Sequence, residues 1–242
     1  MSDLSDVTAA ILAGGMGTRL RSMVADRPKV LALVHGRPFL SYLLDQVATA
    51  GLRDVVLCTG YLGERVEAEF GSAYRSLRLT YSQEATPLGT AGALRLALPL
   101  FKSDTVLALN GDSFCKADLL AFHAWHCARA ATATLFLTRV PDTARYGNVR
   151  LGPEGQILDF VEKNEAGGPG WINAGIYLLQ RHMLQTIPAG QAVSIERETF
   201  PAWIGRGLCG YQGDGPFLDI GTPESYKKAE EFLAHSSVVP HL

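Results

Sequence analysis

Short apolar runs alternate with amphipathic stretches over the first two thirds of the chain. The runs are rich in β-branched residues, and this alternation is typical of parallel strands joined by helical crossovers. We therefore expect an α/β fold. The predicted strands are residues 7–13, 54–59, 77–82, 105–109 and 132–139. The predicted helices are residues 38–50, 63–70, 90–98 and 118–129.

The pattern changes after Val140. Residues 147–151 and 156–161 flank a Pro-Glu-Gly turn and predict a hairpin, and residues 171–179 predict a further strand. We expect a single domain with three parts, namely a first half, a lobe, and a return strand with a C-terminal helix. Within residues 1–242 these parts are residues 1–140, 141–215 and 216–242.

The charge of the chain is balanced. Its formal net charge is −2 and no block of like charges is present, so neither a nucleic-acid partner nor an anionic membrane partner is predicted. No apolar stretch reaches the roughly 20 residues that a bilayer requires. The N-terminus MSDLSDV lacks the basic and apolar regions of a signal peptide, and we expect a cytoplasmic location.

The four cysteines are widely spaced and none forms a C-x-x-C pair. A zinc cluster or a redox pair is therefore not predicted, and we expect Cys58, Cys115, Cys127 and Cys209 to be buried, reduced thiols.

The glycine cluster in AAILAGGMGTRLRS, residues 9–22, follows a predicted buried strand. Such a loop presents backbone N–H groups to an anion, so we expect it to bind phosphate. A dinucleotide-binding loop would have a third glycine where Leu20 stands, and a carboxylate in the region around His35. Both are missing, and so is the Gly-Lys-Ser/Thr of a Walker loop, so these two alternatives are disfavoured.

Cations follow the glycine cluster directly. Arg19, Arg21 and Lys29 are typical of a site that holds several phosphates during transfer. The competing interpretation is that the arginines lie on a solvated turn.

Several motifs occur in order along the chain. They are G-G-M-G-T-R-L followed by R-P-K, E-A-T-P-L-G-T-A-G-A, L-N-G-D, V-E-K, N-A-G-I-Y and F-L-D-I-G-T-P-E-S-Y. In these motifs, from about residue 8 to 232, the chain resembles the sugar-1-phosphate nucleotidyltransferases. These enzymes join a nucleoside triphosphate to a sugar 1-phosphate and release pyrophosphate.

The resemblance implies a Rossmann-like nucleotidyltransferase (GT-A-like) fold. Its sheet would be mostly parallel, mixed at one edge and flanked by helices. The first half would then bind the nucleotide, and residues 141–215 would form a sugar-binding lobe. A homodimer is compatible with the resemblance.

Two carboxylates are candidates for a metal site. Asp112 follows the apolar run TVLAL, at the carboxyl end where parallel sheets bind ligands, and Asp219 stands in a short apolar run before Gly-Thr-Pro-Glu. Carboxylates from distant strands can converge on Mg²⁺ together with substrate phosphates. The alternatives are turn or capping roles beside Gly111 and Gly221.

The expected mechanism needs no general base. The oxygen of a sugar phosphate is already ionised near neutral pH, so it can attack the α-phosphorus in line. Arg19, Lys29 and Asp112 are the predicted catalytic residues, and catalysis would depend on positioning and charge neutralisation by these residues and by Mg²⁺.

Other site residues are implied by the resemblance. The expected nucleotide-binding residues are Leu12, Ala13, Gly14, Gly15, Gly17, Thr18, Glu84, Gly89, Thr90 and Gly111. The expected sugar-phosphate-binding residues are Gly147, Glu162, Lys163 and Asn173.

Some of these residues have alternative interpretations. Gly89 can instead begin a helix, and Glu162 with Lys163 can be an exposed ion pair. Glu196 in SIERETFP is either a sugar contact or an acidic first-turn residue after Ser194, and it stays outside the predicted set.

The substrates are predicted by resemblance alone. The nearest resemblance is to the short guanylyltransferases that act on D-glycero-D-manno-heptose 1-phosphate with GTP. Their product, GDP-heptose, supplies bacterial surface glycans such as lipopolysaccharide, S-layer or capsule. The alternatives are a mannose-1-phosphate guanylyltransferase, or an N-acetylmuramate or glucose 1-phosphate enzyme that uses UTP or dTTP. A catalytically silent nucleotide-sugar-binding subunit is the alternative from a different class.

Overall fold

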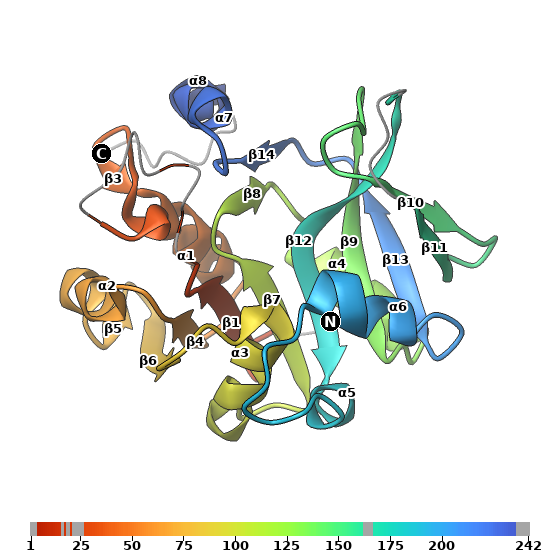
Figure 1. The fold of residues 1–242 in the computed structure, drawn as a ribbon, viewed down its shortest axis with the longest axis horizontal. Coiled ribbons are helices and arrows are strands. Elements are labelled where there is room, and N and C mark those ends of the chain that lie inside the picture. Colours follow the sequence, from red (N-terminus) through yellow and green to blue (C-terminus); the bar gives the residue numbers. More distant parts are fainter. Residues whose placement is uncertain (1–3, 16, 18–19, 21–26, 162–166, 236–242) are drawn as a thin grey trace.

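An eight-stranded sheet forms the centre of the protein in its computed structural model, which describes residues 4–15, 17, 20, 27–161 and 167–235 (Figure 1). Its strands are β1 (Thr8–Ala13), β4 (Asp54–Thr59), β5 (Ala73–Tyr74), β6 (Leu77–Gln83), β7 (Thr105–Asn110), β9 (Ala133–Val140), β12 (Gly170–Gln180) and β13 (Leu208–Gly213). Their order in the sheet is β13-β9-β12-β7-β1-β4-β6-β5. The strand predictions are confirmed to within one residue at each end.

Most of the sheet is parallel, as expected, but the longest strand that runs antiparallel to its neighbours lies inside the sheet. β12 is antiparallel to both of its neighbours, β7 and β9, whereas the edge strand β5 forms only a short antiparallel pair with β6. The expectation of a sheet mixed at one edge was therefore incomplete. The reason is burial: Ile176 and Leu178 of β12 pack into one core and Tyr177 and Leu179 into the other. A strand that is apolar on both faces belongs inside a sheet.

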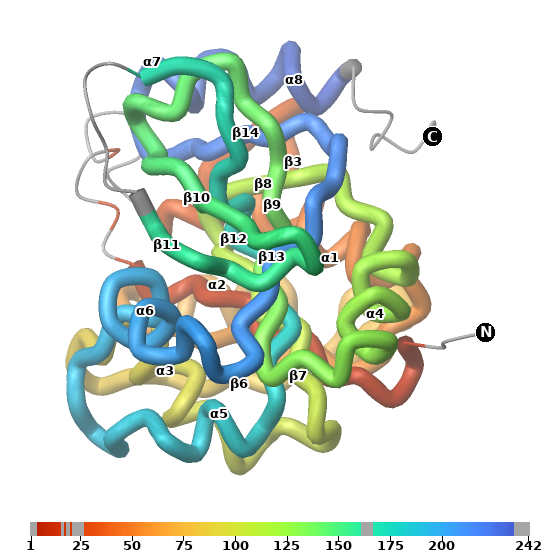
Figure 2. Tube along the Cα trace, turned by 90° about the vertical axis from the view of Figure 1, so that its right-hand side faces the viewer, coloured from red at the N-terminus to blue at the C-terminus, as the bar shows by residue number. Residues whose placement is uncertain are grey.

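Helices cover both faces of the sheet. They are α1 (Phe39–Thr49), α2 (Gly63–Phe70), α3 (Gly89–Ala97), α4 (Leu119–Ala128), α5 (Arg181–Gln185), α6 (Phe200–Ala202), α7 (Pro223–Lys227) and α8 (Ala229–His235). One core takes apolar side chains from α1, α2, α4 and α8, and the other takes them from α3, α5 and α6. Figure 2 shows α4 on one side of the sheet and α3, α5 and α6 on the other. All four predicted helices are confirmed.

Three small antiparallel pairs complete the described structure. β10 (Asn148–Leu151) and β11 (Ile157–Val161) form the predicted hairpin, and β2 (Leu33–Val34) pairs with β3 (Arg37–Pro38). β8 (Ser113–Cys115) pairs with β14 (Phe217–Asp219), which returns the chain to the first half. Residues 141–215 do not form a separate layer, because β12 and β13 belong to the main sheet. The predicted division of the domain into three parts stays a prediction.

Three of the four cysteines are buried and all four are free thiols, but Cys127 is exposed, so its predicted burial was wrong. Within the described ranges, no three His, Cys, Asp or Glu side chains gather in a way that could hold a metal ion. No described helix combines the length and the apolar character needed to cross a membrane.

His126 of α4 is a buried, neutral residue where this helix packs against the sheet. Its side chain is 1% exposed, and its Nδ1 lies 2.7 Å from Thr134 Oγ1. Gln180 Nε2, 3.1 Å from Nε2 of the ring, also donates to Thr105 Oγ1. The ring therefore accepts at Nε2 and donates at Nδ1, which requires the neutral form. Burial, with a smaller effect from His123, lowers the pKa of His126 to about 4.

Stability should fall in acid because of His126. Above pH 6.5 the ring is neutral in the folded and the unfolded chain alike. Between about pH 6.5 and about 4 only the unfolded chain binds the proton, so the free energy of unfolding decreases as the pH falls, by about 3 kcal/mol in total. Urea unfolding at pH 7 and pH 4.5 measures this loss. It should shrink in His126→Gln and persist in the exposed control His182→Gln; equal losses in all three proteins would contradict the assignment.

Candidate active site

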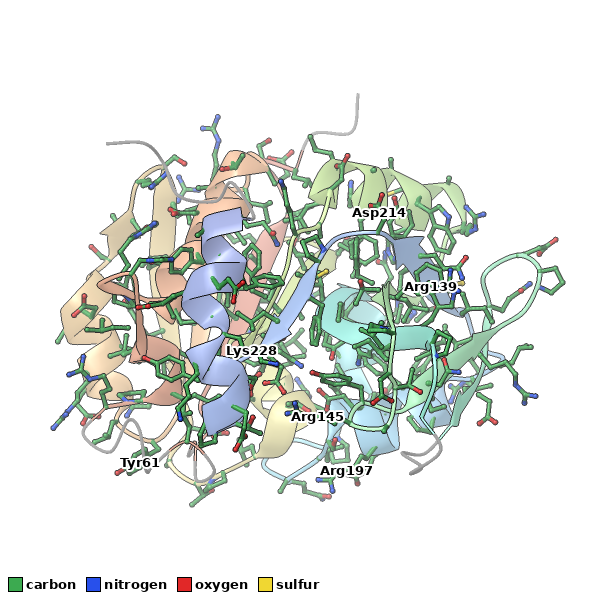
Figure 3. All side chains as sticks on the ribbon, turned by 90° about the horizontal axis from the view of Figure 1, so that it is seen from above. Tyr61, Arg139, Arg145, Arg197, Asp214 and Lys228 are labelled. Atoms are coloured by element: carbon green, nitrogen blue, oxygen red, sulfur yellow. The ribbon has the colours of Figure 1, made fainter. Side chains whose placement is uncertain are left out.

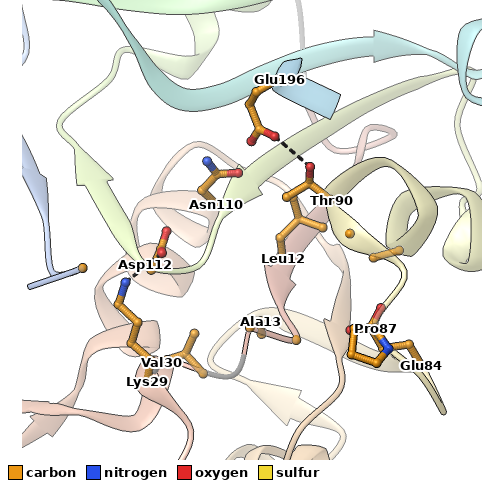
Figure 4. A pocket seen from close by; sticks show the side chains of 16 residues that line it. Leu12, Ala13, Lys29, Val30, Glu84, Pro87, Thr90, Asn110, Asp112 and Glu196 are labelled. Carbon is orange, nitrogen blue, oxygen red and sulfur yellow. Dashed lines mark hydrogen bonds and ion pairs between the residues drawn. The ribbon is translucent and has the colours of Figure 1, made fainter. Parts of the chain in front are cut away.

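A pocket of about 520 Å³ opens at the carboxyl ends of β1 and β7 (Figure 4). Ten predicted site residues line it: Leu12, Ala13, Gly14, Gly15, Gly17, Lys29, Glu84, Gly89, Thr90 and Asp112. Six residues without a predicted role complete the lining: Val30, Pro87, Ala93, Asn110, Glu196 and Gly221. The predicted residues Thr18, Arg19, Glu162 and Lys163 lie outside the described residues.

The glycine loop after β1 lies open to the pocket. A Cβ atom at Gly15 would meet no other atom within 4 Å, so a ligand can approach the backbone closely there. Gly17 has a positive φ of 57°, and its Cβ would lie 3.2 Å from Lys29 Cβ. The positive φ and the nearby Lys29 side chain therefore both favour glycine at position 17.

Glu84 connects the glycine loop with the start of α3. Its Oε2 accepts a hydrogen bond of 2.9 Å from Leu88 N, and a Cβ atom would lie 2.8 Å from Oε1 if added at Gly14 and 2.7 Å from it if added at Gly60. Burial raises the pKa of Glu84 above its ordinary value. Glu84 lies at the pocket wall, as Figure 4 shows.

The start of α3 packs against the segment around Val193. Ala91 N donates to Val193 O at 3.0 Å, and Val193 N donates to Leu88 O at 2.9 Å. Gly89 begins α3 with a φ of 67°, and a Cβ atom there would lie 2.6 Å from Val193 O. Gly89 thus begins the helix and also permits this close backbone contact; its predicted nucleotide-binding role stays a prediction.

Gly89→Ala should destabilise the fold more than Gly190→Ala. Both glycines have positive φ, but a Cβ atom at Gly190 meets nothing within 4 Å. We expect Gly190→Ala to lower the free energy of unfolding by about 1 kcal/mol from backbone strain alone. Gly89→Ala should lower it by about 3 kcal/mol, because the clash with Val193 O adds to the strain. Urea unfolding measures both, and equal losses would show that the Val193 contact is unimportant.

Lys29 and Asp112 form an ion pair at one side of the pocket (Figure 4). Lys29 Nζ lies 2.8 Å from Asp112 Oδ2, and the Asp112 side chain is 45% exposed whereas that of Lys29 is 10% exposed. Gly111 places Asp112 after β7: its N–H donates to Leu12 O at 2.9 Å, and a Cβ atom there would lie 2.5 Å from that oxygen. The predicted catalytic lysine and aspartate are therefore brought together, 83 positions apart in sequence.

Asp219 lies on the strand that pairs with the segment after Asp112. Asp219 is opposite Ser113 in the β8–β14 pair, and Ile220 N donates to Asp112 O at 3.0 Å. Asp219 Oδ1 accepts from the N–H of Gly221, which lines the pocket. Asp112 thus directly precedes β8, and Asp219 lies on β14, which pairs with β8. The carboxylates of these two predicted metal ligands are the type of donor that Mg²⁺ prefers.

The loop around Gly147 contacts the turn that follows β14. Arg145 Nη2 donates to Thr222 Oγ1 at 3.4 Å, and Tyr146 packs edge-on against Phe217 with ring centroids 5.5 Å apart. Figure 3 shows Arg145 between the C-terminal helices and the strands of residues 141–215. Gly147 is not among the residues that line the pocket. It lies in a loop of residues 141–215 that contacts β14 and the turn after it.

Asn173 lies at an irregularity in β12 rather than in the pocket lining. The register of β12 on β9 shifts between Asn173 and Tyr177. Asn173 Oδ1 accepts from Gly175 N at 2.9 Å, and its Nδ2 donates to Tyr177 Oη at 3.0 Å. Both ends of this amide thus have partners within β12.

Glu196 and Asn110 line the pocket although neither was in the predicted set. Glu196 Oε2 accepts from Thr90 Oγ1 at 2.8 Å, and Glu196 also stands in the first turn of the π-helix Ile195–Thr199, after the capping Ser194. Glu196 is therefore a first-turn residue that also lines the pocket, so this position does not exclude a contact with the sugar. Asn110 was visible as the second residue of L-N-G-D, but that motif directs attention to its aspartate.

The sequence of the chain is similar to sequences of known proteins. A family model described as Nucleotidyl transferase matches residues 8–236. A mannose-1-phosphate guanylyltransferase from Mycobacterium tuberculosis is 39% identical over 231 residues, which cover 94% of this chain and 64% of that protein. A D-glycero-alpha-D-manno-heptose 1-phosphate guanylyltransferase from Aneurinibacillus thermoaerophilus is 33% identical over 228 residues, which cover 94% of this chain and 98% of that protein.

A solved structure shares the fold over almost its whole length. The crystal structure of HddC from Yersinia pseudotuberculosis matches with a TM-score of 0.83 at 27% sequence identity, covering 94% of this chain and 99% of that one. The same protein complexed with GMP-PN matches with a TM-score of 0.81, at the same identity and coverage. The chain spans 64% of the length of the mycobacterial relative.

Proposed function

The chain belongs to the nucleotidyl transferase family, as its motifs predicted, and from that premise we propose that it transfers the guanylyl group of GTP to a sugar 1-phosphate. The acceptor that we propose is D-glycero-D-manno-heptose 1-phosphate, and the products are GDP-heptose and pyrophosphate. The observation that carries the proposal is the convergence of the glycine loop, the Lys29–Asp112 pair and Gly221 on one pocket, with Asp219 two residues before Gly221 on the strand that pairs with β8.

The choice of GTP is supported by the relatives. Both curated relatives described above are guanylyltransferases, and the HddC structure with GMP-PN carries a guanine nucleotide analogue. The choice of heptose is supported by the relative that matches over 98% of its own length. Mannose 1-phosphate is the second candidate, because the relative with that activity is 39% identical.

The binding role of the glycine loop follows from its exposure. Gly15 leaves the backbone open to the pocket, so a triphosphate can be held by main-chain groups without interference from a side chain. Lys29 would neutralise charge on the phosphates, and Arg19 has the same predicted role.

The residues at the end of β7 and β14 fit a magnesium site. Asp112 and Asp219 would hold the ion, which when bound supplies charge neutralisation at the α-phosphate. The present partner of Asp112 is Lys29, so the carboxylate is already charge-compensated in the free protein. Binding of the nucleotide would then draw Lys29 toward the phosphates.

The chemistry requires orientation more than proton transfer. A sugar 1-phosphate is ionised near neutral pH, so its oxygen attacks the α-phosphorus directly while pyrophosphate departs on the opposite side. The pocket residues therefore act by holding the two phosphates in line and by compensating charge. GDP-heptose formed in this way would feed the assembly of a surface glycan.

A substrate panel tests the proposal. Pyrophosphate release is measured with Mg²⁺ and each of GTP, UTP, dTTP, CTP and ATP, crossed with heptose, mannose, glucose and N-acetylated sugar 1-phosphates. GTP with manno-heptose 1-phosphate should give the highest kcat/KM. A preference for UTP or dTTP would overturn the guanylyl assignment, and a preference for mannose 1-phosphate would replace only the sugar. No release with any pair would favour a silent nucleotide-sugar-binding subunit.

A further inference from the structure

Tyr177 is a buried hydroxyl shared by three polar side chains. Its Oη lies 3.0 Å from Asn173 Nδ2, 3.4 Å from Asn110 Nδ2 and 3.4 Å from Glu196 Oε1. The residue is 0% exposed, and its ring packs edge-on against Phe200 with centroids 5.0 Å apart. The ring is therefore held in place, and the hydroxyl has a fixed position between β7, β12 and the Glu196 segment.

The number of protons decides the direction of each hydrogen bond. A phenol has one proton and can accept two hydrogen bonds, whereas a carboxylate only accepts. Tyr177 therefore donates to Glu196 and accepts from both asparagines, which must both turn their NH₂ groups toward it. Burial, and next the charge of Glu196, raise the pKa of Tyr177 well above its ordinary value, so the phenol keeps its proton.

The orientation of Asn110 leaves its amide oxygen without a partner. Asn110 Oδ1 is buried and has no hydrogen-bond partner among the described residues, although Asn110 lines the pocket. Asn173 differs, because its Oδ1 accepts from Gly175 N. A buried carbonyl oxygen without a donor is costly, and one at a pocket wall is a natural acceptor for a ligand.

The position of Asn110 favours the sugar as the source of that donor. Figure 4 shows Asn110 between Glu196 and Asp112, across the pocket from Glu84 and Pro87. Asp112 is the predicted catalytic residue beside the reacting phosphate, and β12, which carries Tyr177, also carries the predicted sugar-binding residue Asn173. Sugar hydroxyls are donors that an amide oxygen recognises directly.

We propose that Tyr177 is a positioning residue that holds Asn110 with its amide oxygen toward the pocket, where Asn110 accepts a hydrogen bond from one hydroxyl of the sugar 1-phosphate. This inference rests on the proposed function. It adds two specificity-determining residues, one that contacts the sugar and one that sets the orientation of the contact.

The test combines enzyme variants with deoxy substrates. Wild type, Asn110→Ala and Tyr177→Phe are assayed with the sugar 1-phosphate that the wild type uses best and with its monodeoxy analogues. In the wild type, removal of one particular hydroxyl should lower kcat/KM about 5- to 100-fold, because the Asn110 oxygen loses its donor. In Asn110→Ala the same deoxy analogue and the parent sugar should react about equally well, and in Tyr177→Phe the difference should shrink.

Tyr42→Phe is the matched control. Tyr42 is also a fully buried tyrosine, and its hydroxyl donates to Val34 O at 2.9 Å, away from the pocket. Both tyrosine variants should lower Tm, but only Tyr177→Phe should raise the KM for the sugar 1-phosphate, with the KM for GTP unchanged. If Tyr177 had a purely structural role, Tyr177→Phe would lower Tm and leave the KM for the sugar 1-phosphate unchanged.

Three outcomes would overturn the inference. Deoxy penalties that are the same in wild type and Asn110→Ala would exclude the contact. A rise in the KM for GTP instead of the sugar phosphate would assign the oxygen to the nucleotide. If the wild type makes no nucleotide sugar, the proposed function fails together with this inference, whereas an active wild type with unchanged penalties refutes the inference alone.

Discussion

Asp112→Asn is expected to lower kcat for pyrophosphate release by about 10²- to 10³-fold, the usual cost of losing one charge contact to a transition state. Asp112 ends the segment after β7, pairs with Lys29 and neighbours the strand of Asp219. The amide keeps the shape of the side chain but removes its charge, so the fold should be retained. Steady-state kinetics and a thermal melt measure the two effects separately.

Asp159→Asn is the control for a carboxylate outside the pocket. Asp159 lies on β11, is 50% exposed, and pairs with Arg150 at a distance of 3.4 Å. Its replacement should leave kcat within about twofold, since exposed ion pairs contribute little. If Asp112→Asn has the same mild effect as this control while remaining folded, Asp112 has no role in the reaction.

Lys29→Met is expected to lower kcat/KM for GTP by about 10²- to 10³-fold. The Lys29 ammonium faces the pocket beside Asp112, and its replacement removes the cation proposed to compensate the phosphates. Methionine preserves most of the apolar stem, so packing against Gly17 should change little. The reaction should also become less sensitive to ionic strength, because a charge contact to the triphosphate is lost.

Lys102→Met supplies the comparison. Its Nζ lies 2.7 Å from Asp54 Oδ1 outside the pocket, and the side chain is 64% exposed. It should leave kcat/KM unchanged and lower stability by less than about 1 kcal/mol. Near-normal turnover of GTP by folded Lys29→Met would remove the lysine from the mechanism.

The elements of the fold were largely predictable because periodicity reports burial directly. The runs that became β1, β4 and β7 are apolar on both faces, as interior parallel strands must be. The position of β12 was not predictable in the same way. Its apolar run indicates a buried strand, but its insertion between β7 and β9 in the opposite direction depends on contacts between residues far apart in the chain.

The candidate site was predictable where local motifs report backbone geometry. The glycine cluster, R-P-K and L-N-G-D indicate the loop, Lys29 and Asp112 as candidates without any knowledge of tertiary contacts. Glu196 stayed outside the predicted set because an acidic residue after Ser194 also suits the first turn of a helix. Asn110 was missed because L-N-G-D directs attention to its aspartate, whereas its place in the pocket lining depends on tertiary contacts. The contact of Gly89 with Val193 O was likewise invisible, because it joins segments about a hundred residues apart.

In the proposed reaction, a sugar phosphate oxygen displaces pyrophosphate from the α-phosphorus of GTP. ³¹P NMR of a reaction that contains GTP and a sugar 1-phosphate with ¹⁸O at its three non-bridging phosphate oxygens tests this most directly. The expected product is a nucleotide sugar that retains all three labelled oxygens, one of them as the bridge between the phosphorus atoms, together with unlabelled pyrophosphate. Labelled oxygen in pyrophosphate or in inorganic phosphate, or release of pyrophosphate without a labelled nucleotide sugar, would contradict it.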